Sequence, residues 1–67
     1  MIIHVHYHNH KAYCKCNQEV MIQENGIWVP AVLYYSQEEP NKYFVRSQDE
    51  FGEKFIEVDV PLAPQHR

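Results

Sequence analysis

Hydrophobic and polar residues alternate one by one at the start of the chain. Ile3, Val5 and Tyr7 fall on one side of an extended segment. The other side carries a row of four histidines, His4, His6, His8 and His10. Because a period of two is typical of a β-strand with one buried face, we expect a strand here with its aliphatic side in the core. The histidine row would then face solvent or a partner.

Two strands joined by a tight turn are predicted in the middle of the chain. Asn25-Gly26 is favoured in type I′ hairpin turns, because both positions need a positive φ. The segment before it, 19–23, is short, whereas 27–35 is a longer apolar run rich in β-branched and aromatic residues. This composition predicts a strand that is buried on both faces over part of its length. Pro30 cannot donate a backbone hydrogen bond, so the strand must lie at an edge or carry a bulge there.

A short helix is predicted after a further strand at 43–46. Ser47 and Glu50 have the spacing of a capping box, in which the first residue caps the helix and the second lies in its first turn. Phe51 and Phe55 are four residues apart, so a helix places them on one side. Gly52 weakens the middle of the helix and limits it to about two turns.

The last strand alternates again, with Ile56, Val58 and Val60 expected to point inward. Pro61 ends it, and residues 61–67 are expected to form a flexible tail. A chain of 67 residues is too short for two cores, so residues 1–60 are expected to form one small domain. Closing a small sheet on itself encloses a core and removes edges. We therefore expect a mainly β fold, a partly open barrel of four to five antiparallel strands with one short helix.

Several segments resemble an uncharacterised domain family of bacteria and phages. The similar segments are 27–35 and 43–47, followed by Phe51 and Phe55. The family opening, Tyr-x-His with a nearby Lys-Gly, is similar to 7–12, where Ala12 replaces the glycine; its Val-Arg-Pro-x-x-x-Phe close is similar to 45–51, where Ser47 replaces the proline. The resemblance covers residues 7–57. It implies a small SH3-like barrel and a prokaryotic or phage setting, and it implies no catalytic residues.

The composition argues against several functional classes. The formal charge of −3 is too small to indicate a nucleic-acid binder. Neither a glycine-rich phosphate loop nor a catalytic serine motif is present, and a chain of this length has little room for a concave pocket. We expect no enzyme, no cofactor and no small-molecule substrate. The sequence shows neither a signal peptide nor an apolar run long enough to cross a membrane, so we expect a cytoplasmic protein.

Two cysteines raise an alternative from another functional class. Cys14 and Cys16 are so close that a bridge between them would be strained and would barely constrain the unfolded chain, so we expect reduced thiols. Together with the histidine row they would complete a tetrahedral zinc site if the two strands lie side by side. The spacing matches no common zinc motif, so we assign no metal ligand. A zinc-stabilised mini-domain is the alternative, because small cores often need a metal.

Aromatic residues gather in 27–35 and 43–46, which we expect to be neighbouring strands. Trp28 and Phe44 are expected in the core. Adjacent residues of a strand point to opposite faces, so some of the tyrosines must point outward. Tyrosine and arginine are enriched at protein interfaces. We therefore predict a protein-binding site at Tyr34, Tyr35, Glu38, Glu39, Tyr43 and Arg46.

The predicted function is a non-enzymatic protein-binding module. The family resemblance suggests a small phage or bacterial regulator or inhibitor of a host protein. Residues 1–18 hold Lys11 and Lys15 and no acids, whereas 38–59 are mostly acidic. A basic front and an acidic back would orient a protein partner. A second alternative is a weak binder of single-stranded nucleic acid, since aromatic residues with a few bases on a small barrel also occur in such proteins.

Overall fold

The computed structural model describes residues 1–61 of the chain. Its elements follow in the order β1 (Ile2–His6), β2 (Ala12–Lys15), β3 (Val20–Glu24), β4 (Ile27–Ser36), β5 (Glu39–Ser47), α1 (Gln48–Lys54) and β6 (Phe55–Asp59). The predicted mainly β class with one short helix is confirmed, with six strands in the described residues where four to five were expected. Of the predicted tail, residues 62–67 lie outside the described part of the chain.

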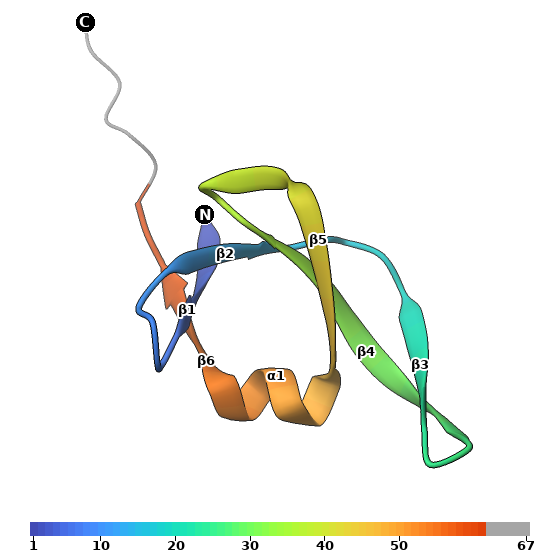
Figure 1. The fold of residues 1–67 in the computed structure, drawn as a ribbon. Helices are drawn as coiled ribbons and strands as arrows, with labels where there is room; N and C mark the ends of the chain where they lie inside the picture. The colour runs from blue at the N-terminus through green and yellow to red at the C-terminus, as the bar shows by residue number, and fades with distance from the viewer. Residues whose placement is uncertain (62–67) are drawn as a thin grey trace, which may run out of the picture.

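β4 is the central strand of one antiparallel sheet (Figure 1). β5 pairs with β4 along one side, while β3 and β2 share the other side, β3 beside the start of β4 and β2 beside its end. β1 follows next to β2, and β6 next to β1. The sheet is therefore open, with free edges at β5, at β6 and along the outer side of the short strand β3. α1 connects the β5 and β6 edges and contacts β4, β5 and β6 (Figure 1).

Three local predictions are confirmed. Asn25 and Gly26 have φ angles of 52° and 78° and join β3 to β4, as a tight hairpin turn requires. The Ser47 Oγ accepts a hydrogen bond of 3.2 Å from the backbone N–H of Glu50 and so caps α1. Pro30 lies opposite β3, and β5 begins to pair with β4 only one residue later, so the proline lies where β4 has a free edge.

The core lies between β4 and α1. Its buried apolar side chains are Val32, Tyr34, Phe51 and Phe55, with Tyr13 packed against them. The rings of Phe51 and Phe55 stack with their centroids 4.2 Å apart, as the predicted four-residue spacing allows. No side chain among the described residues is less than 2% exposed. The core that α1 covers is therefore small.

The histidine side of β1 faces the core, whereas we expected the aliphatic side to do so. His4 is 7% exposed, and its ring meets that of Phe51 edge-on at 5.0 Å. His6 meets Phe55 in the same way at 4.8 Å. Ile3 and Val5 consequently point to the other face of the sheet. The prediction of an aliphatic inner side was wrong because the aromatic core accepts imidazole edges.

The rest of the histidine row lies outside the strand. β1 ends at His6, and His8 and His10 are exposed in the segment that leads to β2. The His6 Nδ1 accepts hydrogen bonds from the backbone N–H groups of His8 and Asn9, which folds the turn back over the end of the strand. Tyr7, expected in the core, is exposed in the same turn. The prediction of four imidazoles along one strand face was wrong.

Three other core predictions were also wrong. Trp28 is 62% exposed, because it lies in the part of β4 where only β3 is paired with the strand. Phe44 is 36% exposed; it lies on the edge strand with its ring stacked on that of Tyr34 at 5.6 Å. Ile56 is exposed opposite Val5, on the face of the sheet that α1 leaves open.

Candidate functional site

The strand register divides the side chains of the sheet between two faces. Residues opposite each other in an antiparallel pair point to the same face, and neighbours along a strand point to opposite faces. One face holds Val32, Tyr34 and Phe55 and packs against α1. The other face is named the helix-free face below.

All six strands contribute to the helix-free face. Tyr35 lies opposite Cys14 on one side and Tyr43 on the other, and Val5 lies opposite Ile56, which connects the strands into one surface. The members are Ile3, Val5, Ala12, Cys14, Val20, Ile22, Glu24, Ile27, Val29, Ala31, Leu33, Tyr35, Tyr43, Val45, Ile56 and Val58, with Ser47 at the border.

The helix-free face is apolar and almost without charge. Among its members, Glu24 at the end of β3 is the one charged residue. The most exposed apolar members are Ile27 at 65%, Tyr43 at 58%, Val45 at 46% and Ile56 at 44%. Monomeric proteins rarely expose a contiguous apolar patch larger than a few hundred Å² unless the patch binds a partner. The helix-free face is therefore the candidate functional site.

Two of the predicted binding residues, Tyr35 and Tyr43, lie opposite each other on this face. Their rings meet edge-on with centroids 5.8 Å apart. Tyr43 is exposed and Tyr35 is half-buried. Cys14, which faces Tyr35 across the β2–β4 pair, raises the pKa of the Tyr35 phenol by hydrogen bonding to it and by repelling its ionised form. Because the pKa is raised, the Tyr35 phenol is uncharged, and this part of the face is neutral.

Two other predicted binding residues, Tyr34 and Arg46, lie on the opposite face. Tyr34 is 4% exposed, so the prediction that it lies in a binding surface was wrong. The Arg46 Nε donates a hydrogen bond of 2.8 Å to the Tyr34 hydroxyl, and Arg46 Nη1 lies 3.5 Å from Glu50 Oε2. Burial acts to lower the pKa of Arg46, but the bond to Tyr34 and the charge of Glu50 outweigh it and raise the pKa. Arg46 thus joins β5 to β4 and α1.

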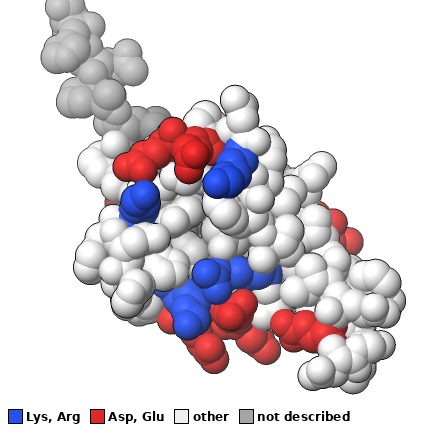
Figure 2. All heavy atoms as spheres, in the orientation of Figure 1, with Lys and Arg blue, Asp and Glu red and all other residues white. Residues whose placement is uncertain are grey.

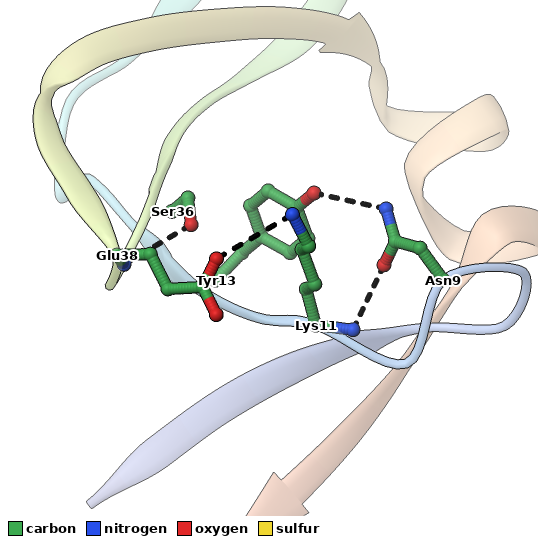
Figure 3. Close-up of polar contacts among 5 residues, drawn as sticks. All are labelled: Asn9, Lys11, Tyr13, Ser36 and Glu38. Carbon is green, nitrogen blue, oxygen red and sulfur yellow. Dashed lines mark hydrogen bonds and ion pairs between the residues drawn. The ribbon is translucent and has the colours of Figure 1, made fainter.

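The two predicted acidic members, Glu38 and Glu39, lie at the turn between β4 and β5. Glu38 Oε1 is 3.4 Å from Lys11 Nζ (Figure 3). The backbone N–H of Lys11 donates to Asn9 Oδ1, and Asn9 Nδ2 donates to the Tyr13 hydroxyl (Figure 3). The basic start of the chain and the acidic turn therefore meet. On the face that Figure 2 shows, Lys and Arg side chains likewise lie next to Asp and Glu, which differs from the predicted separation into a basic front and an acidic back.

The histidines and cysteines of residues 1–61 do not come together as a metal site. His4 and His6 point to the α1 side, whereas Cys14 points to the helix-free face and Cys16 lies just beyond β2. Burial lowers the pKa of His4; burial and the nearby charge of Arg46 lower the pKa of His6. Within residues 1–61, no three His, Cys, Asp or Glu side chains are arranged to hold a metal ion.

A hollow of about 520 Å³ opens where β1 and β2 diverge, and both His4 and Cys14 line it. A thiol enzyme would need the imidazole to accept the thiol proton there. The His4 ring instead packs against Phe51. In the described part of the chain, no hydrogen bond joins His4 to Cys14, whose Sγ accepts one of 3.4 Å from Gln37 Nε2. The hollow does not assemble a nucleophile with its base.

The sequence did not reveal the aliphatic part of the helix-free face. Ile3, Val5 and Ile56 were expected in the core. A signal was present in β4, where neither set of alternate residues contains a charge. A strand that is apolar on both sides predicts cover on both sides, yet one short helix can cover only one.

No protein-family model matches the chain, and neither a curated protein nor a solved structure shows significant similarity to it. The resemblance to the bacterial and phage family therefore stays a hypothesis. Among the described residues, no helix is both long and apolar enough to span a membrane.

Proposed function

We propose that the protein acts by binding another protein chain through the helix-free face and that it catalyses no reaction. The observation that carries this proposal is the face itself, which offers uncharged side chains from all six strands. Tyr43, Val45 and Ile56 stand out as well-exposed apolar members. A surface of this composition matches one half of a protein interface, whose centre is poor in charge and rich in apolar and aromatic residues.

The paired tyrosines supply the anchor of the proposed interface. Tyrosines contribute a large contact area with few rotatable bonds, and they are frequent among the residues that dominate binding energy. Tyr35 is held by its contact with Tyr43, so little side-chain freedom is lost on binding. Glu38 and Glu39 at the adjacent turn would lie at the polar rim. As a finer hypothesis from the family resemblance, the partner is a host protein that this chain regulates or inhibits.

The charges favour a protein partner over nucleic acid. Lys11 is paired with Glu38, and Arg46 with Glu50. A nucleic-acid site needs basic residues that are free to contact successive phosphates. The face with the largest apolar exposure is almost uncharged, which suits a protein surface instead.

Site-specific photo-crosslinking in the native cell tests the proposal. A benzophenone amino acid replaces Val45 on the helix-free face, and in a matched control it replaces Glu53, which is exposed on α1. We expect a discrete protein adduct from position 45 and none of that size from position 53. Crosslinking only to nucleic acid, or the same diffuse adducts from both positions, would contradict the proposed function.

A further inference from the structure

The helix-free face fits a second copy of this chain. We infer that two copies pack their helix-free faces together about a two-fold axis, as two sheets of a sandwich do. This inference rests on the proposed function and names a second copy of the chain, in place of a host protein, as the partner of that site. Sheets that pack face to face lie about 10 Å apart with their apolar side chains interdigitated.

The size of the core supports this arrangement. Four buried apolar side chains form the cluster under α1, and none of the described side chains is less than 2% exposed. Small domains of this length often gain the missing burial by oligomerising. Leu33 and Val29, on the central strand, are only half-buried in a single copy, so a facing sheet would complete their burial.

The charge pattern allows the helix-free faces of two copies to pack against each other. A two-fold interface brings the same surface patch from both subunits together, so any charge near its centre would meet a like charge. Glu24 lies at the hairpin end of the face, far from Tyr35 at the other end of β4. With the two β4 strands antiparallel, the two Glu24 carboxylates lie at opposite ends, roughly 30 Å apart on the length of a ten-residue strand. The centre of the interface then contains no charge.

The extent of the face also suits a weak dimer. Strands about 4.8 Å apart, with same-face residues about 6.6 Å apart, give each residue about 32 Å² in projection. Sixteen residues therefore span roughly 500 Å² in projection, which is below the ~800 Å² per partner of a standard interface and near the size of a weak one.

The free edge of β5 is less suited to self-association. Pro40 removes a backbone donor from this strand, and Lys42 places a charge in it. Proline and lysine are residues by which natural edge strands avoid pairing with another chain. Two copies would consequently meet through their faces and not through the β5 edge.

Sedimentation equilibrium of the purified full chain, from micromolar to millimolar concentration, tests the inference. Val45→Lys places a charge on the helix-free face at an already exposed position. Trp28→Lys is the matched control, since Trp28 is exposed on the opposite side of β4. We expect a dimer for the natural chain and for Trp28→Lys, and a monomer, or a dimerisation constant at least about tenfold weaker, for Val45→Lys. Circular dichroism shows that each variant is folded; if Val45→Lys is unfolded, Ile56→Lys replaces it.

The outcomes separate this inference from the proposed function. A natural chain that stays monomeric at the highest concentration, or equal dimerisation of both variants, overturns self-association. If the benzophenone at position 45 then gives an adduct with a different protein, the proposed function stands. If it gives no protein adduct either, both fail.

Discussion

The Tyr34 hydroxyl accepts a hydrogen bond of 2.8 Å from Arg46 Nε, and this bond joins the central strand to the edge strand β5. The Tyr34 ring lies in the core, while Arg46 also forms an ion pair with Glu50 on α1. The three side chains thus link β4, β5 and α1 at the place where the sheet meets its helix. Their role is structural.

Tyr34→Phe removes the hydroxyl and leaves a partly buried arginine without that partner. We expect the free energy of unfolding to fall by at least about 1 kcal/mol. A hydrogen bond contributes about this much net, and more when one partner is charged, as Arg46 is. Urea denaturation followed by circular dichroism measures it. Tyr43→Phe, at an exposed ring on the other face, is the control and should change stability little. Equal losses in both variants would contradict this role of the bond.

His4 makes stability depend on pH. Burial lowers its pKa; nearby Glu57 acts to raise the pKa and Lys15 to lower it, without reversing the shift. The unfolded chain therefore takes up a proton first as the pH falls through about 6.5, the ordinary histidine pKa. Stability from His4 is complete above that pH and decreases below it.

We expect the denaturation midpoint in urea to decrease between about pH 7.5 and pH 5.5, on either side of the histidine pKa. His4→Phe keeps a ring against Phe51 and should make this part of the profile less steep, while His6, whose pKa is also lowered, retains part of the slope. Trp28→Ala, which changes an exposed side chain without a titratable group, should leave the slope unchanged. A profile that is just as steep in His4→Phe would assign the pH dependence to other groups.

Phe51 is expected to contribute more to stability than Trp28, although the tryptophan side chain is larger. Phe51 is buried against Phe55, so Phe51→Ala should cost about 3 kcal/mol or more. Trp28 is 62% exposed, and Trp28→Ala should cost less than about 1 kcal/mol. Thermal unfolding compares the two. A larger loss in Trp28→Ala would mean that the β3–β4 hairpin packs against something in solution.

Ser47→Ala removes the cap of α1. The Ser47 Oγ accepts the Glu50 backbone N–H, and loss of such a cap costs about 1 kcal/mol. Ser47→Asp keeps an acceptor and should retain most of the stability. Gln48→Ala, at an exposed position in the same turn, is a second control. Denaturant unfolding that ranks Ser47→Ala no lower than these two would contradict the capping role.

The sequence predicted those features that depend on neighbouring residues. The Asn25-Gly26 turn follows from two positions that accept positive φ, and the start of α1 follows from Ser47 and its spacing to Glu50. Pro30 likewise predicted a free edge from its missing donor. Each depends on backbone chemistry within a few residues, so no knowledge of distant contacts was needed.

The sequence did not predict which face of the sheet is covered. Alternation in β1 separates Ile3 and Val5 from His4 and His6, but it assigns neither pair to the core. The aromatic rings that decide this come from Phe51 in α1 and Phe55 at the start of β6, almost fifty residues away along the chain. They pack against the imidazole side of β1. The binding-site prediction mixed Tyr34 with Tyr35 for the same reason.

The seven residues of α1 connect two free edges of the sheet, those of β5 and β6. Their length sets how far apart β5 and β6 are held, and so how strongly the six strands bend. Insertion or deletion within this connection would reshape the far surface without altering any residue on it. New recognition partners could thus arise from changes of length in a segment that never touches them.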